Sequence, residues 1–178
     1  MSSINAEQPE PNHADLHGPA ALTKIRELVK QAQTCFFCTA ITTGRAVTTR
    51  PMAVQTVDDN GHLWFLSASD SGVNADLAQD RTTQLLFQGS PHSDFLTLYG
   101  RSVVSTDRAK IDELWNPLLK TWFTGGKDDP RITVIEVVPT DGYYWDTKHG
   151  HAVALVKMVV GAISGKTLDD SIEGKVRV

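Results

Sequence analysis

The spacing of apolar residues along the chain predicts three helices. Over residues 19–32 they recur three to four positions apart, which places them on one helix face, and Pro19 suits a first helical turn. Ser71 can cap a short helix that runs through Gln79. Asp107 can begin a third helix through Leu119. Helices are therefore expected at 19–32, 71–79 and 107–119.

Segments rich in β-branched and aromatic residues predict strands between these helices. Gly100 lies in the middle of one of them and predicts a bend or bulge. Residues 152–160 are apolar and suit a buried helix or a buried strand, which their periodicity does not separate. The predicted strands are Cys35–Thr42, Val47–Val57, Leu63–Ala68, Thr83–Gln88, Phe95–Ser105 and Ile132–Val138, with Tyr143–Asp146 extending or following the last.

The order of these elements favours an antiparallel fold. Asn60-Gly61 is a strong hairpin signal between two of the strands. Strands and helices do not alternate regularly, so an α+β class with a small, mainly β antiparallel barrel and helical caps is predicted. Residues 1–18 are rich in proline and acidic residues and predict a disordered lead. Residues 19–178 are then expected to form one domain.

Composition narrows the class of protein. The chain has 178 residues, of which 40% are hydrophobic, and this is enough for one domain with a substantial core. Its formal net charge of −4 gives no basic surface for nucleic acid. No apolar run is long enough to cross a bilayer, and the N-terminus lacks a secretory signal pattern. A cytoplasmic protein without membrane or nucleic-acid partners is predicted.

The sequence gives weak signals for metal or redox chemistry. Cys35 and Cys38 form a C-x-x-C pair, which reads as a redox pair or as half of a zinc site. A strand would direct the two sulfurs to opposite faces, and this favours two buried, reduced thiols. His149 and His151 are the one close histidine pair, with Asp146 nearby, and a solvated loop is the favoured interpretation. No metal site is predicted.

The stretch TTRPMAVQ, residues 48–55, points to an anion site. It reads as a strand, but Pro51 cannot donate a ladder hydrogen bond and so suits an edge. A partly buried arginine at position 50 calls for a carboxylate or a phosphate. If the strands pair across Asn60-Gly61, Arg50 lies opposite about position 71, at the start of a helix whose N–H groups favour anions.

Two interpretations of Arg50 remain open from the residues alone. The first is a phosphate pocket in which hydroxyl groups add donors, namely those of Ser67, Ser69 and Ser71. The second is a surface arginine on an edge strand, paired with Asp70 or Asp76. A cluster of aromatic residues is equally ambiguous between core, a platform for a planar ring and a dimer interface: Trp115, Trp122, Phe123, Tyr143, Tyr144 and Trp145.

Five motifs, in order from about residue 33 to 146, resemble a known family. They are RPMAV, LWFLSASDS, LYGRSVV, LWNPLLKTWFTGGKDDPRI and VVPTDGYYWD. The chain resembles the general stress protein 26 group of the pyridoxamine 5′-phosphate oxidase-like, flavin-binding split-barrel proteins. The resemblance implies a split β-barrel of the FMN-binding type. It also implies a homodimer with FMN, or FAD, held between the subunits.

The resemblance also implies roles for individual residues. Arg50 would hold the flavin phosphate, and the main chain of Pro51, Met52 and Ala53 would approach the ring. Further phosphate contacts would come from Ser67, Ser69 and Ser71. The loop that carries Trp122, Phe123 and Gly125 would pack close to the cofactor.

Two departures from the family pattern qualify this expectation. Relatives usually carry a lysine near position 73 as a second phosphate cation, and this chain has Val73. Loss of that charge, worth on the order of 1–4 kcal/mol at a semi-exposed site, weakens phosphate binding or shifts flavin preference. The C-terminal arginine and histidine motif of true pyridoxamine phosphate oxidases is not visible, which argues against vitamin B6 oxidation.

The predicted function is therefore a flavin-binding general stress protein. It would act as a flavin reductase or another flavin-dependent oxidoreductase, with a nicotinamide as candidate electron donor. The sequence offers no evident proton donor, so no catalytic residue is named. The alternatives are a non-enzymatic flavin-binding or interaction protein, and a barrel holding another ligand such as haem or a deazaflavin.

Overall fold

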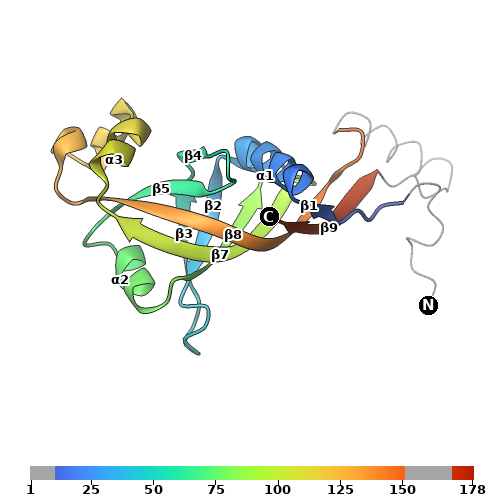
Figure 1. The fold of residues 1–178 in the computed structure, drawn as a ribbon, viewed down its shortest axis with the longest axis horizontal. Coiled ribbons are helices and arrows are strands. Elements are labelled where there is room, and N and C mark those ends of the chain that lie inside the picture. Colours follow the sequence, from blue (N-terminus) through green and yellow to red (C-terminus); the bar gives the residue numbers. More distant parts are fainter. Residues whose placement is uncertain (1–10, 151–169) are drawn as a thin grey trace.

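Strand β8 (Ile132–Thr147) is the longest described strand and organises the sheet. One of its edges pairs with β7 (Phe95–Ser105); the other pairs with β5 (Leu63–Ala68) and then with β9 (Ser171–Arg177). The computed structural model describes residues 11–150 and 170–178. Both ranges contribute to this one sheet, in which β8 runs along the length of the molecule (Figure 1).

The described strands form a nine-stranded sheet in the order β1-β9-β8-β7-β6-β2-β3, with β4 and β5 attached to the side of β8. The pairs are antiparallel except for β1 with β9. The ladder ends at β1 and β3, so the described sheet is not closed, and the class is α+β with mostly strand. The remaining strands are β1 (Leu16–His17), β2 (Thr34–Thr39), β3 (Thr48–Ala53), β4 (Thr56–Val57) and β6 (Thr82–Gln88).

Strand β1 contradicts part of the predicted disordered lead. Leu16 lies opposite Val176 in the parallel β1–β9 pair, and Ala14 N donates to Glu173 O at 2.9 Å. Backbone pairing with β9 therefore orders residues within the range 1–18 that was predicted to be disordered. Residues 1–10 and the apolar segment 152–160 lie outside the described residues.

The first two helices confirm the sequence analysis. Helix α1 spans Pro19–Ala32 and buries Ala21, Ile25, Leu28 and Val29. Helix α2 spans Gly72–Gln79, and the Ser71 side chain accepts a hydrogen bond from Asn74 N as the predicted cap. The apolar spacing thus predicted α1, and the capping residue Ser71 predicted the start of α2.

The third helix is shorter than predicted. Helix α3 spans Arg108–Leu114, with Asp107 as its cap, and Trp115 is already extended. Pro117 disfavours helical geometry at the residue before it, and Asn116 has φ −132° and ψ 154°. The chain resumes as two 3₁₀ turns, η2 (Pro117–Thr121) and η3 (Gly126–Asp128). A continuous helix to Leu119 is therefore wrong.

The strand predicted over Val47–Val57 divides into two. Strand β3 pairs with β2, where Arg50 lies opposite Phe37, whereas β4 pairs with β5, where Val57 lies opposite Leu63. The Asn60-Gly61 hairpin does form, but β4 has only two residues. Because β3 leaves this hairpin for the edge of β2, the predicted register that set Arg50 opposite position 71 is wrong. The edge position of Pro51 is confirmed.

Two apolar clusters fill the described molecule. The main core lies between α1 and the sheet and includes Phe37, Phe65, Leu85 and Leu98, all close to zero exposure. A second cluster forms beneath α3 and η2 and includes Ile111, Leu119, Phe123 and Ile132. The two clusters support different ends of the sheet, which Figure 1 shows as separate helical regions.

We expect Gly100→Ala to destabilise the fold. The register of β7 against β8 shifts between Tyr99 and Gly100, as the glycine in this strand predicts. A Cβ at Gly100 would lie 2.3 Å from Val138 O and 2.9 Å from Val138 C, and these backbone atoms cannot swing aside. Overpacking of this kind costs about 1–3 kcal/mol, or about 2–12 °C in Tm for a chain of this size.

Thermal unfolding followed by circular dichroism measures this loss. Gly72→Ala is the matched control, because a Cβ there meets only Arg50 Nη2 at 4.0 Å. Its Tm should equal or exceed that of the wild type, since alanine is the better helix former. Equal Tm values for Gly100→Ala and the wild type would contradict the close approach of the Val138 backbone to Gly100.

Candidate functional site

Arg50 lies on edge strand β3 and forms an ion pair with α2. Its Nη2 is 2.7 Å from Asp76 Oδ2, and its Nη1 donates to Thr39 Oγ1 at 3.2 Å. Thr39 Oγ1 donates in turn to the same Asp76 oxygen at 2.7 Å. Hydrogen bonds from Arg50 and then Thr39 lower the pKa of Asp76, against a smaller opposing effect of burial. The carboxylate partner that the sequence offered as one interpretation, Asp76, is therefore present.

The ion pair brings Arg50 to the start of α2. A Cβ built on Gly72 would meet only Arg50 Nη2 within 4 Å, so the space over the first turn is open with the guanidinium at its rim. Two of the five guanidinium N–H donors are engaged by the side chains described above. Among the described residues, no further hydrogen bond engages the other three. Contact between Arg50 and this turn was predicted, but through a register that does not form.

The serines of the β5–α2 connection lie beside this space in unequal positions. Ser67 Oγ and Ser71 Oγ are 2.9 Å apart, and Ser71 also caps the helix. Ser67 is buried, Ser71 is half-buried and Ser69 is exposed. The hydroxyls of Ser67 and Ser71 therefore form one hydrogen-bonded pair at the helix start, and Ser69 lies on the surface.

Val73 occupies the position at which the resemblance led us to expect a lysine. Its side chain is buried in the main core. The first turn of α2 therefore presents backbone N–H groups and serine hydroxyls, and position 73 contributes packing. Arg50 is the cation that the structure places next to Gly72.

The residues after Arg50 alternate between the two faces of β3. Met52 packs against the main core, whereas Pro51 and Ala53 are exposed. Pro51 lies opposite Phe36 of β2 and lines a surface hollow of about 350 Å³. The four predicted residues of this stretch are thus divided, with Arg50 and Met52 on one side and Pro51 and Ala53 on the other.

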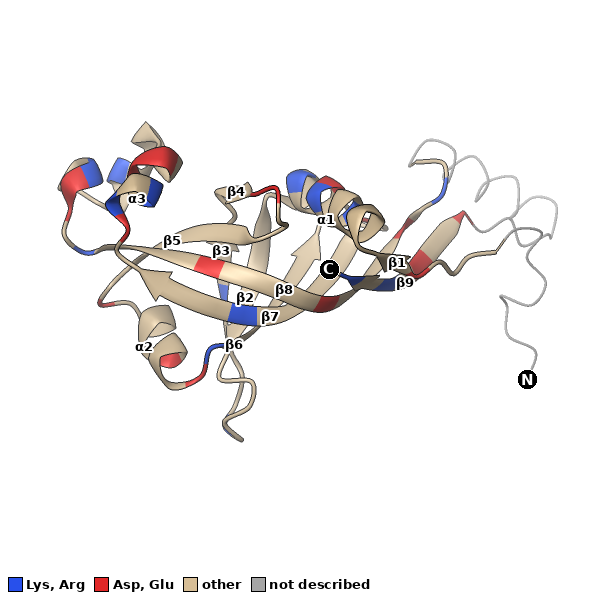
Figure 2. Cartoon of the chain, in the orientation of Figure 1, with Lys and Arg blue, Asp and Glu red and all other residues tan. Residues whose placement is uncertain are grey.

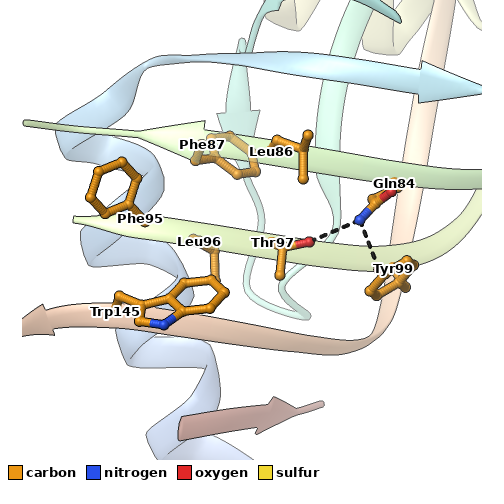
Figure 3. A pocket seen from close by; sticks show the side chains of 8 residues that line it. All are labelled: Gln84, Leu86, Phe87, Phe95, Leu96, Thr97, Tyr99 and Trp145. Carbon is orange, nitrogen blue, oxygen red and sulfur yellow. Dashed lines mark hydrogen bonds between the residues drawn. The ribbon is translucent and has the colours of Figure 1, made fainter. Parts of the chain in front are cut away.

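The outer face of the sheet carries a row of exposed apolar and aromatic side chains. Figure 3 shows Leu86, Phe95 and Trp145 around a hollow of about 400 Å³. At its polar end, Gln84 Nε2 donates to Tyr99 OH at 2.8 Å and to Thr97 Oγ1 at 3.3 Å (Figure 3). We call this surface the outer apolar face; it comprises Phe36, Pro51, Leu86, Phe95, Tyr99 and Trp145.

The loop predicted to pack near the cofactor lies beside α3, at the second apolar cluster. Trp122 is 68% exposed, while Phe123 is buried in the second cluster. Gly125 packs against Asp129, whose pKa falls to about 2 because Arg131 and then backbone groups hydrogen bond to it. Figure 1 separates this region, next to α3, from α2. Within the described part of one chain, Trp122, Phe123 and Gly125 are not brought to Arg50.

The two cysteines are buried and free on strand β2. Burial, and secondarily the neighbouring Cys38, raises the pKa of Cys35 to about 12. The interpretation of buried reduced thiols is confirmed for the structure.

The thiols should resist labelling in the folded protein. The thiolate is the reactive form, and burial of both side chains blocks access to it. We expect native protein at pH 8 to react with a chromogenic disulfide reagent far more slowly than free cysteine does. In denaturant, two thiols per chain should react. Rapid native labelling would contradict the buried arrangement.

The histidine pair of the sequence is not assembled with Asp146 in the described residues. His149 Nδ1 lies 2.6 Å from Asp170 Oδ1, and Lys24 Nζ lies 2.8 Å from Asp146 Oδ2. His151 lies outside the described residues. Asp146 thus serves an ion pair that joins α1 to β8.

The structure gathers a cluster that the sequence analysis missed. Asp58, His62 and Glu136 each direct one ligand-type atom into a common space, with these atoms all within 4.8 Å of one another. Asp58 and His62 flank the Asn-Gly turn, which is a signal that the sequence does contain. Glu136 comes from β8, 74 residues beyond His62.

The distribution of charged residues and the hydropathy of the helices do not mark a further functional site. Figure 2 shows Lys and Arg interspersed with Asp and Glu over the helices and strands. Among the described residues, no helix has the length and apolar character that a membrane span requires.

Comparison with known proteins identifies relatives over most of the chain. The profile described as "Pyridoxamine 5'-phosphate oxidase like" matches residues 20–169. Protein bli-3 of Neurospora crassa is 29% identical over 126 residues, which cover 66% of this chain. The aligned part covers 60% of bli-3, so the match extends over less than two thirds of that relative.

Solved structures share the fold. A general stress protein 26 from Jannaschia sp. CCS1 superimposes with a TM-score of 0.74, at 24% identity, over 88% of this chain and 97% of the other. The general stress FMN/FAD binding protein of Xanthomonas citri has a TM-score of 0.57 and 28% identity, over 67% of this chain and 82% of the other. The resemblance inferred from the sequence motifs is confirmed by these matches.

Proposed function

The chain belongs to the pyridoxamine 5′-phosphate oxidase-like family, and from this premise we propose that it is a flavin-binding general stress protein. The observation that carries the proposal is the guanidinium of Arg50 at the rim of the open first turn of α2. The Xanthomonas citri relative, described as binding FMN or FAD, supports a flavin as the ligand. FMN is the proposed cofactor, with FAD as the alternative.

The donors at this site suit a phosphate group. A guanidinium binds phosphate through charge-assisted hydrogen bonds, and the N-terminus of a helix favours an anion. Arg50, Ser67, Ser69 and Ser71 are the proposed phosphate residues. Asp76 already occupies part of the guanidinium, so the phosphate would use the remaining N–H groups. The main chain of Pro51, Met52 and Ala53 is proposed to approach the flavin ring.

We propose that the active assembly is a homodimer with flavin at the subunit interface. The outer apolar face supports this, because side chains such as Phe36, which is 55% exposed, are typical of an interface core. Trp122 supports it too, because this large aromatic side chain is exposed in its own subunit and aromatic residues are enriched at interfaces. The loop with Trp122, Phe123 and Gly125 is proposed to approach the flavin held by the partner subunit.

The proposed fold type is a single split-barrel domain over residues 19–178. Two backbone contacts support it by joining the segment between β3 and β4 to the residue before β2 and to β5. Val54 N donates to Gln33 O at 3.0 Å, and Gln55 N donates to Trp64 O at 2.8 Å. These two hydrogen bonds connect the β2 side of the sheet to β5 where no continuous β-ladder joins them.

A bound flavin would supply hydride or electron transfer, while the protein supplies binding and polarity. We propose a cytoplasmic flavin reductase or flavin-dependent oxidoreductase that accepts electrons from a nicotinamide. The alternative is a stress protein that holds flavin without turnover. No residue is assigned to proton transfer.

Two measurements test the proposal. The absorption spectrum and extracted cofactor of the purified full chain should identify FMN or FAD, and a haem or deazaflavin spectrum would reject it. Anaerobic addition of NADH or NADPH should bleach the bound flavin, and oxygen should restore it through repeated cycles. A flavoprotein that is not reduced would be a non-enzymatic flavin carrier.

A further inference from the structure

The turn that joins β4 to β5 places two ligand-type side chains next to each other. Asp58 N donates to His62 O at 3.0 Å, so the turn closes with these two residues side by side. Asp58 Oδ1 accepts hydrogen bonds from Asn60 N at 2.9 Å and His62 N at 3.0 Å. This ties one carboxylate oxygen of Asp58 to the turn and leaves Oδ2 directed elsewhere.

Strand β8 supplies the third group. Glu136 lies opposite Trp64 in the β5–β8 pair, and its Oε1 is 2.7 Å from His62 Nδ1. Asp58 Oδ2 is 3.9 Å from the same imidazole nitrogen. One nitrogen and two carboxylate oxygens therefore converge from the two ends of a turn and a neighbouring strand.

The surrounding contacts hold this arrangement in place. Trp64 Nε1 donates to Asp58 Oδ2 at 3.0 Å, and Arg26 Nη2 donates to Asp58 O at 2.9 Å. These contacts, with the two backbone hydrogen bonds to its Oδ1, orient the Asp58 carboxylate as a ligand. Groups that orient ligands in this way increase metal affinity.

The charge around the cluster also favours a cation. Among the described residues, no lysine or arginine side chain forms a salt bridge with the carboxylates of Asp58 and Glu136. Arg26 contacts the Asp58 carbonyl and lies 3.6 Å from Asp59 Oδ1. Figure 2 marks the turn after β4 as acidic. Two carboxylates facing one imidazole leave an excess of negative charge.

From this geometry we propose that Asp58, His62 and Glu136 bind a divalent transition-metal ion of the Zn²⁺ class. Imidazole suits zinc and its neighbours, whereas Mg²⁺ and Ca²⁺ prefer oxygen ligands. Three protein ligands leave a coordination position for water, and the side chains are each 26% exposed, so water reaches the site. The ion would fix the β4–β5 turn to β8. None of the three residues belongs to the proposed flavin site, so the two proposals are independent.

Calorimetric titration of the tag-free, chelator-treated full chain with Zn²⁺ tests the site. We expect one ion per chain, and we expect His62→Gln and Glu136→Gln each to weaken binding at least about tenfold. Zn²⁺ at a hundredfold excess over Kd should raise Tm by about 5–10 °C, and a chelator should reverse this. Mg²⁺ should give no comparable shift.

The matched control is the double variant His149→Gln/His151→Gln, which removes the close histidine pair and should retain full affinity. Co²⁺ should give ligand-field bands in the wild type that are lost in His62→Gln. The thermal shift in each variant without metal reports whether the variant folds. The proposal is overturned if no ion binds, if His62→Gln binds as tightly as the wild type, or if the control loses binding.

Discussion

Arg50→Ala is expected to weaken FMN binding by about tenfold to hundredfold, because hydrogen bonds to charged groups contribute about 1.5–3 kcal/mol each. The guanidinium lies at the rim of the open space over Gly72 and is half-buried, so a phosphate there would be less screened than on the surface. Riboflavin, which lacks the phosphate, should bind the variant and the wild type with equal affinity. Fluorescence quenching of each flavin measures both constants.

Two matched variants separate the phosphate role from a structural one. Asp76→Asn removes the ion pair from its other end and keeps the cation, so FMN affinity should be retained or increased. Arg101→Ala removes an exposed arginine from β7 and should have no effect. If Asp76→Asn weakened FMN binding as much as Arg50→Ala does, the arginine would act by holding α2. Equal losses of affinity for FMN and riboflavin in Arg50→Ala would also indicate this structural role.

Phe36→Glu is expected to convert the proposed dimer to a monomer and to abolish most FMN binding. The side chain is 55% exposed in one subunit and lies on the outer apolar face between Pro51 and Leu86. A glutamate buried in an apolar interface would lose its hydration without gaining a partner. Analytical ultracentrifugation gives the mass of the assembly, and titration with FMN gives the affinity.

Val178→Glu is the control for this variant, because Val178 is exposed to a similar degree but lies at the C-terminus. It should remain dimeric and bind FMN as the wild type does. Circular dichroism of Phe36→Glu should show intact secondary structure, since the outer face is not part of the core. A wild-type protein that sediments as a monomer, or a monomeric variant with full FMN affinity, would reject an interfacial flavin site.

Sequence patterns predicted helices and strands best where residues close in the sequence determine the bounds of the element. Helix α1 has the predicted bounds because its apolar face and Pro19 are both local signals. Strand β5 also matched, since its alternation is set by burial on one face. The end of α3 could have been predicted from Pro117, which restrains Asn116.

Pairing partners were harder to predict than elements. The hairpin signal at Asn60-Gly61 is correct. It does not predict that the preceding strand divides, so that β3 pairs with β2 and only β4 pairs with β5. The break at Val54 depends on a hydrogen bond to Gln33, which is distant in sequence and close in space. Register in a sheet is a property of the whole sheet, so a single hairpin cannot set it.

The phosphate-binding chemistry of the candidate site stays a prediction, whereas the strand register predicted for it is wrong. The proximity of Arg50 to the start of α2 comes from the ion pair with Asp76, which the sequence offered as a competing interpretation. Trp122 is largely exposed in its own chain, and its approach to a flavin held by a partner subunit stays a proposal. The cluster around His62 depends on Glu136, which no local spacing connects to it.

Titration of the flavin-free full chain with FMN, in parallel with riboflavin, tests the central claim most directly. A phosphate site at Arg50 and α2 predicts saturable quenching at one FMN per chain, with riboflavin bound at least about tenfold more weakly, a difference of about 1.4 kcal/mol. Failure to saturate at about 100 μM FMN, or equal affinity for the two flavins, would contradict it.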